Sequence, residues 1–516
     1  MKNPLRYVFI ILMGAVTGCK TVPGNVASAD DGLIEIIFLQ VNDVYEIEPI
    51  AAGKVGGMAR VATLKKQYQK QNPNTFLIIA GDFLSPSVYN SLPFEGKTIR
   101  GRQMVEAMNV AGIDLAVFGN HEFDIKENEL QERLNESKFG WVASNTFHKQ
   151  KDQVIPFART SGTQNQPFPQ YRILTVKDAD GTTAKIGIIG LTLPFTQAPY
   201  VTYTNSLTTA KELYQSLKDS VDAVVAITHQ TIRQDLELAR EIPGLALIMG
   251  GHEHDSRQDK VGNIFITKAH ANARSAYIVK LTVDKKRQTV TSQPTLKYLD
   301  ETVSLDSATS RVVQKWAAIA NANYSTLGFD AKKILLIQTE PLDGREAEIR
   351  RHATSLTQLI TAAIADAAPL AEVVLVNAGS IRVDDILTAP VTQYDIIRTL
   401  PFGGGIKEAD LKGNLLEKVL NQGRKNAGNG GFLHYNQAVT FNADENTWQI
   451  KNKPLEQNKI YRVAITDFLF SGQEANLSFL NPDNPEVVKI YPSAASVSNP
   501  QADIRRAIIM YLQKKR

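Results

Sequence analysis

Residues 33–45 read LIEIIFLQVNDVY, in which 33–41 are an apolar run with a single charge, followed by the pair Asn42-Asp43. A run of this kind is typical of a strand buried on both faces of its sheet. Residues 57–71 follow, and they place apolar side chains at helical spacing. Further apolar runs that predict strands lie at 75–80, 115–118, 185–190, 223–228, 245–249 and 263–267, with another helix expected at 102–110. This alternation of strand and helix predicts an α/β fold.

The chain has 516 residues, which is too many for one hydrophobic core, so we expect two domains. The first would span 34–300 and the second 330–516. Residues 301–329 would connect them through a helix at 307–323. In the second domain we expect a helix at 348–368 and a strand at 372–376.

The charge balance argues against a nucleic-acid polymer as partner. The chain has 57 basic and 53 acidic residues, a net charge of +4, and 21% charged residues against 43% hydrophobic ones. These values are typical of a globular protein, and no run of Lys and Arg is long enough to follow a phosphate backbone. No protein partner is evident from the sequence.

The N-terminal segment predicts secretion and an anchor. Residues 1–19 begin with basic residues, continue through an apolar stretch and end at Cys19, the only cysteine of the chain. This end resembles a bacterial lipobox, in which the cysteine is lipidated; the alternative is a plain signal peptide with an incidental cysteine. Lys20 follows, as in lipoproteins sent to the outer membrane. We therefore expect a lipid-anchored protein facing the periplasm or the cell surface, with residues 20–33 as a tether.

Five polar clusters stand at or just after the expected strands of the first domain. They are Asn42-Asp43-Val44-Tyr45, Gly81-Asp82, Gly119-Asn120-His121-Glu122-Phe123-Asp124, Thr228-His229 and Gly250-Gly251-His252-Glu253-His254. In open α/β folds, ligands bind outside the carboxyl ends of the strands, so the clusters are expected to converge. Carboxylate, amide and imidazole groups in this number suit two divalent metal ions, the arrangement that hydrolyses phosphate esters at neutral pH.

These clusters resemble the calcineurin-like metallophosphatases, and more narrowly the bacterial 5′-nucleotidase/UDP-sugar hydrolase family. The narrower resemblance also rests on Gly56-Gly57-Met58-Ala59-Arg60 and on the second domain. It implies an N-terminal four-layer αββα metallophosphatase domain, a connecting helix and a smaller α/β domain that binds the substrate. It also implies hydrolysis of a phosphoester by metal-bound hydroxide.

The resemblance assigns a role to each cluster residue. Asp82 would bridge the two metals; Asp43 and His254 would hold the first, and Asn120, His229 and His252 the second. His121 would assist departure of the leaving oxygen, and Asp124 would orient His121. An alternative role for Asp124 is the N-cap of a helix at 126–134. Glu122 and Glu253 are interpreted as residues behind the ligands or at the solvent.

Tyr45 departs from the family's Asp-x-His pattern, and three interpretations stay open. Its phenolate could ligate the first metal, because a cation lowers the pKa of a phenol. It could leave its place to a water molecule, or it could weaken the first site and so lower activity. Mn, Zn, Co or Mg would suit the other ligands, and ligation by Tyr45 would favour a harder ion such as Fe(III) or Mn.

In the second domain the resemblance points to residues that bind the organic part of a substrate. Arg345, Arg350 and Arg382 would bind phosphate or carboxylate, although the first two could also belong to a solvated helix face. Phe402 and Phe468 would stack on a nucleobase, or alternatively lie in the core. Glu474 replaces an expected Asp that holds the ribose or base, and Gly404 replaces an Asn.

The sequence therefore predicts a metallophosphoesterase, with a 5′-nucleotidase as the leading hypothesis. The alternatives are a 2′,3′-cyclic nucleotide phosphodiesterase with 3′-nucleotidase activity and a UDP-sugar diphosphatase. A further alternative from another class is a nucleotide-binding surface lipoprotein that has lost turnover through Tyr45. The expected substrate is thus a nucleotide or a nucleotide-sugar.

Overall fold

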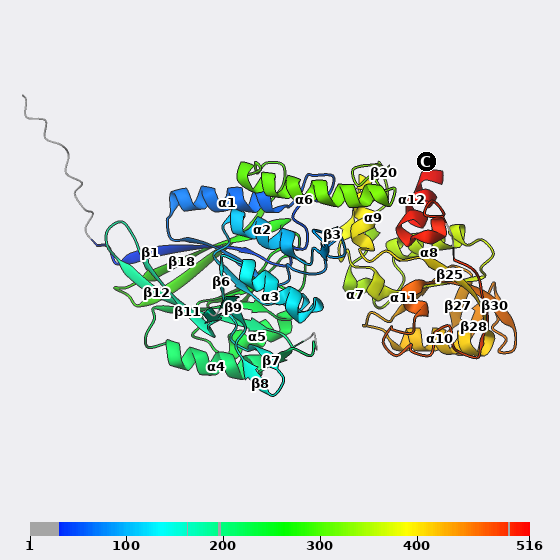
Figure 1. Cartoon of the computed structure of the whole chain (residues 1–516). Helices are drawn as coiled ribbons and strands as arrows, with labels where there is room; N and C mark the ends of the chain where they lie inside the picture. Colours follow the sequence, from blue (N-terminus) through cyan, green and yellow to red (C-terminus); the bar gives the residue numbers. More distant parts are fainter. Residues whose placement is uncertain (1–29, 163, 195–197, 494–495, 516) are drawn as a thin grey trace, which may run out of the picture.

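The computed structural model describes residues 30–162, 164–194, 198–493 and 496–515. Cys19, the expected signal segment 1–19 and all but the last four residues of the tether lie outside this part. Figure 1 shows two lobes side by side, one blue to green and the other yellow to red, with helix α6 (Ser307–Thr326) running along the top from the first toward the second. No helix in the described ranges is long and apolar enough to cross a membrane.

Two six-stranded sheets form the first lobe. One sheet has the order β19-β18-β1-β2-β5-β6 and the other β11-β12-β14-β15-β17-β16. The first contains β19 (Thr289–Tyr298), β18 (Ser275–Asp284), β1 (Leu33–Val41), β2 (Thr75–Ala80), β5 (Leu115–Val117) and β6 (Gly140–Trp141). The second contains β11 (Tyr171–Lys177), β12 (Thr183–Thr192), β14 (Ala223–His229), β15 (Leu247–Gly250), β17 (Ile264–Lys268) and β16 (Arg257–Val261). Neighbours β1-β2-β5-β6 and β12-β14-β15-β17 are parallel, so their carboxyl ends share an edge.

The alternation of side chains along the strands builds four layers. On β1, Ile36 and Phe38 join a core that the two sheets share, whereas Leu39 and Val41 join a core under the helices. The helices over the first sheet are α1 (Met58–Gln71), α2 (Arg102–Ala111) and α3 (Glu127–Glu136), and those over the second are α4 (Ser206–Leu217) and α5 (Ile232–Glu241). Each such fully buried side chain contributes roughly 1.5–3 kcal/mol. The expected αββα architecture is confirmed.

The second lobe is a five-stranded sheet covered by helices on both faces. Its order is β26-β22-β30-β25-β31. The strands are β26 (Leu433–Tyr435), β22 (Val373–Asn377), β30 (Ile460–Thr466), β25 (Ile406–Lys412) and β31 (Val487–Ile490). Val374 and Val376 pack under helices α8 (Ser355–Ala367) and α12 (Ile504–Lys514), while Leu375 faces the opposite core with α10 (Gly413–Lys425). The smaller α/β domain expected from the resemblance is thus present.

The expected single helix at 348–368 is wrong. The chain forms a short helix α7 (Glu346–Ile349), turns, and starts again as α8. Thr354 explains the break, because its side chain accepts a hydrogen bond from the backbone N–H of Thr357 and its own N–H donates to the Thr357 hydroxyl. This reciprocal pair caps a new helix start.

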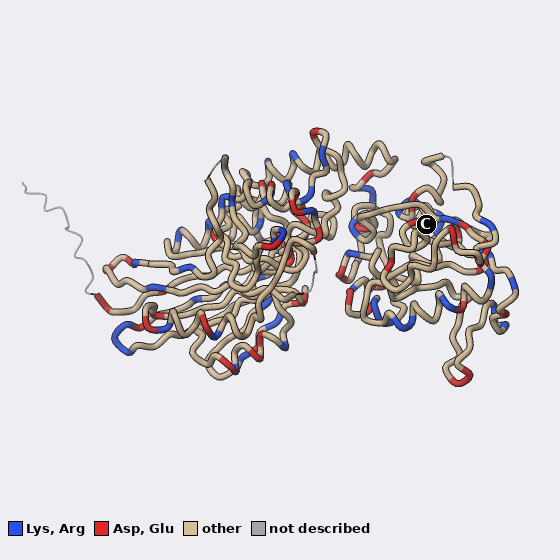
Figure 2. The backbone as a smooth tube through the Cα atoms, turned by 60° about the horizontal axis from the view of Figure 1, so that its bottom comes forward, with Lys and Arg blue, Asp and Glu red and all other residues tan. Residues whose placement is uncertain are grey.

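Smaller elements surround these layers. They include β7 (Thr146–Gln150), β8 (Gln153–Ile155), β13 (Val201–Tyr203), β20 (Ile334–Leu336), β21 (Leu342–Asp343), β23 (Ile386–Leu387), β24 (Val391–Thr392), α9 (Gln393–Thr399), β27 (Val439–Asn442), β28 (Thr447–Ile450) and α11 (Asp467–Phe470). Figure 2 shows basic and acidic positions interspersed over both lobes, in keeping with the near balance of charge.

Helix α6 is fastened to the first lobe. The Trp316 side chain is fully buried, and its indole N–H donates to Glu106 on α2 at 2.9 Å. Farther along α6, the Tyr324 hydroxyl donates to the carbonyl of Val88. The helix at 307–323 was expected, whereas the domain boundaries given above stay predictions.

Candidate functional site

The polar clusters of the first lobe meet at one edge of its two sheets. Asp43 follows β1, Asp82 follows β2 and His229 ends β14. One ligand atom from each of these three buried residues lies within 4.8 Å of the other two. Convergence follows from parallel strand order, because each strand delivers its carboxyl end to the same edge.

Four candidate ligands adopt a left-handed backbone. The φ angles are 53° at Asp43, 56° at Asp82, 91° at His252 and 58° at His254. Such angles cost about 1–3 kcal/mol at a residue other than glycine and cluster at functional sites. Backbone hydrogen bonds hold the strained turns, since the N–H of His252 donates to Asp43 Oδ2 at 2.9 Å and the N–H of His121 to Asp82 Oδ1 at 2.7 Å.

The glycines of the clusters are required by close approach. A Cβ on Gly119 would lie 2.1 Å from Asp82 Oδ1, and one on Gly81 would lie 2.5 Å from His229 Nδ1. A side chain at either position would displace a candidate ligand. The Gly-Asp and Gly-Asn pairs in the sequence therefore reflect the packing of the site.

Asn120 and His229, two of the ligands expected for the second metal, present buried donor atoms to the site. The His229 Nδ1–H donates to the carbonyl of Ala80 at 2.8 Å, which turns Nε2 toward Asp82 Oδ2 at 3.0 Å. Asn120 Oδ1 is buried and has no hydrogen-bond partner among the described residues. An amide oxygen, an imidazole nitrogen and a carboxylate are a suitable donor set for a divalent ion. The residues present therefore fit a metal.

The buried carboxylates of Asp43 and Asp82 also favour a positive charge beside them. Burial lowers the pKa of His229, but the carboxylates of Asp82 and Asp43 outweigh burial and raise that pKa to about 9. The shift means that the buried pair of carboxylates stabilises a proton on this imidazole. A divalent ion would satisfy the same demand.

Tyr45 lies inside the first-metal group. Its hydroxyl oxygen is 2.9 Å from His254 Nε2, 3.3 Å from Asp82 Oδ2 and 3.5 Å from Asp43 Oδ1, and its side chain is buried. Burial and the carboxylates of Asp82 and Asp43 raise the pKa of the phenol well above 10. The hydroxyl is thus a proton donor here, and ligation by Tyr45 stays a prediction.

His121 and Asp124 form a close pair. The Nδ1 of His121 lies 2.6 Å from Asp124 Oδ2, and Arg382 Nη2 from the second lobe lies 3.5 Å from the same Nδ1. Burial lowers the pKa of His121, but Asp124 and Asp82 raise it above its usual value. The alternative role of Asp124 as an N-cap is wrong, because α3 starts after Lys126, whose N–H donates to Glu129.

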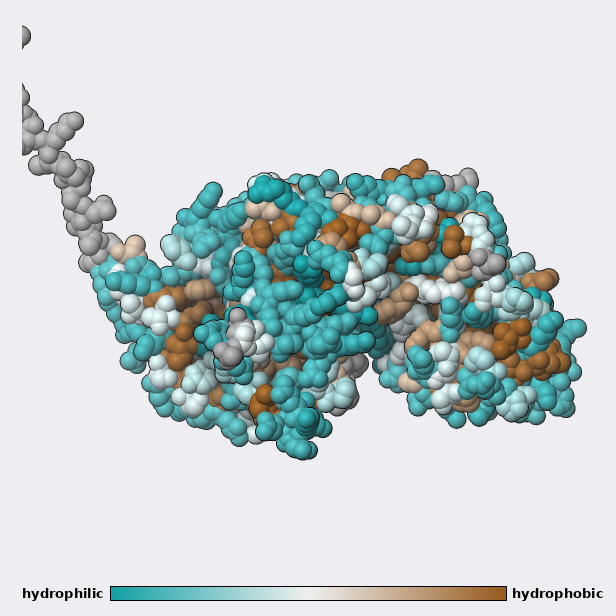
Figure 3. All heavy atoms as spheres, in the orientation of Figure 1, coloured by the Kyte–Doolittle hydropathy of each residue, from teal (hydrophilic) through white to brown (hydrophobic). Residues whose placement is uncertain are grey.

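A cavity of about 610 Å³ lies between the two lobes at this edge of the sheets. Its walls include Asp82, Asn120, His121, His252 and His254 from the first lobe, and Arg345, Arg350, Arg351 and Asp384 from the second. The space-filling view shows the outline of the molecule narrowing where the lobes meet (Figure 3). The cavity places candidate metal ligands and cationic side chains around one space of small-molecule size.

The expected substrate residues differ in how they face this cavity. Arg345 pairs with Asp343 at 2.6 Å and Arg350 with Glu346 at 2.8 Å, and both line it. Phe402 and Phe468 are 65% and 46% exposed, so the interpretation of both as core residues is wrong. Neither is among the residues lining the cavity.

The segments that carry the two phenylalanines adjoin each other. The N–H of Gly405 donates to Asp467 Oδ2 at 2.8 Å, and the N–H of Asp467 donates to the Gly405 carbonyl at 3.0 Å. Glu474 lies beside the end of β22, where it accepts a hydrogen bond from Asn377 Nδ2 at 2.5 Å. Two exposed aromatic faces on joined segments could receive a flat ring.

Comparison with known proteins agrees with this arrangement. Residues 36–256 match the family model of the calcineurin-like phosphoesterases, and residues 335–479 match that of the C-terminal domain of 5′-nucleotidase. The chain belongs to the 5′-nucleotidase family of calcineurin-like phosphoesterases. It is therefore a metallophosphoesterase, as the clusters predict.

Relatives of this phosphoesterase come from bacteria and animals. The trifunctional nucleotide phosphoesterase protein YfkN of Bacillus subtilis is 23% identical over 88% of this chain, which spans only 33% of that longer protein. The 5′-nucleotidase of Rattus norvegicus is 24% identical over 81% of this chain and 78% of its own length. The crystal structure of a 5′-nucleotidase precursor from Thermus thermophilus shares the fold, with a TM-score of 0.67, 21% identity and coverage of 93% of this chain and 97% of that one.

Sequence reasoning gave no role in this site to a buried lysine behind the ligands of the phosphoesterase. Lys268, the last residue of β17, is fully buried and donates to the carbonyls of Gln230 and Gly251 at 2.6 and 2.8 Å. It also pairs with Asp235 at 2.9 Å and with Glu253. Lys268 thereby joins the loops that follow His229 and precede His252. Its signal in the sequence is a charge at the end of an apolar strand.

Glu122 also supports the site from behind. Its buried carboxylate accepts hydrogen bonds from the backbone N–H groups of Gly119, Asp82, Phe83 and Leu84 at 2.6–3.1 Å. Burial raises the pKa of Glu122 to about 7. The interpretation of Glu122 as a residue behind the ligands agrees with these contacts, and the two loops it joins carry Asp82 and Asn120.

Proposed function

We propose that this phosphoesterase is a 5′-nucleotidase that releases phosphate from nucleoside 5′-monophosphates. The observation that carries the proposal is the cavity between the lobes, where candidate metal ligands face Arg345 and Arg350. A phosphate bound there would meet cations from both sides. The names of the rat relative and of the Thermus thermophilus structure support the same substrate class.

The metal ligands proposed are those expected from the sequence. Asp43, Tyr45, Asp82 and His254 would hold one ion, and Asp82, Asn120, His229 and His252 the other, with Mn, Zn, Co or Mg as candidates and Fe if Tyr45 ligates. When bound, two such ions would supply a nucleophile from water and neutralise charge on the phosphate.

The side chains around His121 would handle the leaving group. Asp124 engages His121 Nδ1 at 2.6 Å, so Nε2 is the atom left to give a proton to the departing 5′-oxygen. Arg382, 3.5 Å from the same ring, would bind an oxygen of the phosphate. This division leaves proton transfer to the first lobe and phosphate binding mainly to the second.

The nucleoside would be bound by the second lobe. Phe402 and Phe468 expose their rings, and stacking contributes about 1–3 kcal/mol per base. Gly404 and Glu474 depart from the family pattern, so the preference for base and sugar would differ from that of the family. The alternative substrates are 2′,3′-cyclic nucleotides and 3′-nucleotides, which one enzyme would hydrolyse in turn, or a UDP-sugar.

We further propose that the mature protein is held by a lipid at Cys19 and faces the periplasm or cell surface. The position of the single cysteine after an apolar stretch supports this location. Metabolic labelling with a palmitate analogue tests it: wild type would be labelled and Cys19→Ser would not. Equal labelling of the two proteins would contradict the anchor.

A substrate panel tests the activity. AMP, UMP, 3′-AMP, 2′,3′-cyclic AMP and UDP-glucose would be compared by kcat/KM with Mn²⁺, Co²⁺, Zn²⁺ and Mg²⁺. We expect the highest value for a 5′-monophosphate. A higher kcat/KM for a cyclic nucleotide or UDP-glucose would show that the proposed substrate is wrong. Bound metal without turnover of any phosphoester would overturn the proposed enzymatic activity.

A further inference from the structure

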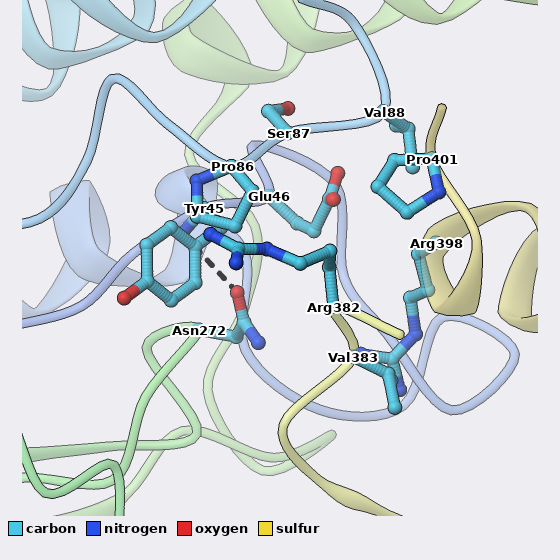
Figure 4. Close-up of a pocket in the computed structure, with 10 residues that line it drawn as sticks. All are labelled: Tyr45, Glu46, Pro86, Ser87, Val88, Asn272, Arg382, Val383, Arg398 and Pro401. Atoms are coloured by element: carbon cyan, nitrogen blue, oxygen red, sulfur yellow. Dashed lines mark hydrogen bonds between the residues drawn. The ribbon is translucent and has the colours of Figure 1, made fainter. Parts of the chain in front are cut away.

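One short segment of the second lobe makes contacts across the cavity. Arg382 reaches His121 and Asp124, Asp384 reaches His254, and Asp385 reaches Arg274 at 2.6 Å. The segment follows the end of β22 and precedes β23. Figure 4 shows Arg382 and Val383 of this segment facing Tyr45 and Asn272 of the first lobe around a small pocket of about 10 Å³. The contacts between the two lobes therefore lie next to the candidate metal ligands.

Asp384 contacts one of those ligands directly. Its Oδ2 lies 2.5 Å from His254 Nδ1, and its Oδ1 accepts the backbone N–H of Glu346 at 2.5 Å. The opposite nitrogen, His254 Nε2, points into the site, 2.9 Å from the Tyr45 hydroxyl and 3.4 Å from Asp43 Oδ1. The imidazole is thus held from behind by the second lobe and faces the first-metal group.

This arrangement is the one that orients histidine ligands in metal sites. A carboxylate that accepts the hydrogen bond of one ring nitrogen fixes the tautomer, so that the other nitrogen offers its lone pair to the ion. His229 is fixed in the same way by the carbonyl of Ala80, within its own lobe. His254 differs, because the residue that fixes it belongs to the other lobe.

We propose that Asp384 is a positioning residue through which the second lobe completes the first metal site. The inference rests on the proposed binding of two metals. Docking of the lobes then orients His254 and strengthens one site, while the site of Asn120, His229 and His252 is complete within the first lobe. By linkage, occupation of the first site stabilises the docked arrangement by the same factor.

The backbone of Asp384 determines which variants are informative. Its φ is 36°, a left-handed angle that asparagine and glycine tolerate better than alanine. Asp384→Asn keeps the shape but removes the charge, and Asp384→Gly removes the side chain altogether. Asp385→Asn is the matched control, since it removes the interlobe ion pair with Arg274 and leaves His254 untouched.

Calorimetric titration of the metal-free, full mature chain with Mn²⁺ measures the effect. In wild type we expect two binding events. Loss of the outer partner of a histidine ligand weakens metal binding 10- to 100-fold. We therefore expect one event to weaken by about that factor in Asp384→Gly, and by a smaller factor in Asp384→Asn, whose amide oxygen still accepts the hydrogen bond without the charge, with the other event unchanged in both. In Asp385→Asn both events should stay within about threefold of wild type.

A spectroscopic readout separates positioning from a general loss of structure. In spectra of the metal-free protein labelled with ¹⁵N-histidine, the signal that disappears in His254→Ala should move in both Asp384 variants and stay in place in Asp385→Asn. Two unchanged Mn²⁺ events in the Asp384 variants would overturn the inference and leave the proposed function intact. A wild-type protein that binds no Mn²⁺, Co²⁺ or Zn²⁺ would overturn both.

Discussion

Replacing Lys268 by methionine should destabilise the first lobe and loosen its metal site. The ammonium group is fully buried and makes two hydrogen bonds to carbonyls and two ion pairs, with Asp235 and Glu253. Methionine has a similar length but leaves the fully buried carboxylate of Asp235 without its cation. Breaking a buried pair from one side costs about 3–5 kcal/mol. At roughly 2–4 °C per kcal/mol, we expect the Tm to fall by roughly 10 °C.

The same substitution should also weaken metal binding, because Lys268 holds two loops that carry candidate ligands. The carbonyls of Gln230 and Gly251 adjoin His229 and His252 in the chain, and Lys268 holds both. Differential scanning calorimetry of the metal-free protein gives the stability effect, and Mn²⁺ titration gives the affinity. The second-metal event, which uses these two histidines, should weaken more than the first.

A double-mutant cycle controls for a simple cavity effect. Asp235→Asn removes the stranded charge, so Lys268→Met combined with Asp235→Asn should be less destabilised than Lys268→Met alone. The reasoning fails if Lys268→Met changes the Tm by less than 2 °C, or if the two substitutions add without any recovery.

Three further predictions concern the ligands and the substrate. Asp82→Asn should abolish phosphatase activity with little change in circular dichroism, because Asp82 is the proposed bridge; retained turnover would refute that role. Phe402→Ala should raise KM for AMP more than for p-nitrophenyl phosphate, since its ring is 65% exposed and available for stacking; equal effects would argue against it. Tyr45→His should preserve or raise turnover with Zn²⁺ or Mn²⁺, because it restores the family pattern; a collapse of turnover would show that the phenol is required.

The elements of the first lobe were predictable where the pattern is local. The strands β1 and β2 begin and end at the expected residues, because each is an apolar run bounded by polar residues. The long hairpin of β18 (Ser275–Asp284) and β19 (Thr289–Tyr298) was not expected. β19 is half exposed, so it has no continuous apolar run. The break before α8 was missed because Thr354 caps a helix through a side-chain contact that hydrophobic spacing does not reveal.

Some residues of the candidate site were likewise predictable from local sequence, and others were not. Asp43, Asp82, His229 and His252 were found because each stands at a strand end, where a polar residue after an apolar run is visible in the sequence. Asp384 and Lys268 were not assigned a place in the site, because their partners lie far away in the chain or in the other lobe. Phe402 and Phe468 were placed on the right domain, but only the structure showed that both rings face solvent.

The sequence by itself determined the alternation of strand and helix, the polar residues at the strand ends and the family they resemble. These depend on short-range periodicity and on local punctuation, which each segment carries alone. Only the tertiary structure decided that Tyr45 lies among three candidate ligands, that Lys268 joins two loops behind them and that Asp384 reaches His254 from the second lobe. Such contacts form when the packing of the layers and lobes brings together side chains that are far apart in the sequence. No local sequence pattern reveals which of these side chains will meet.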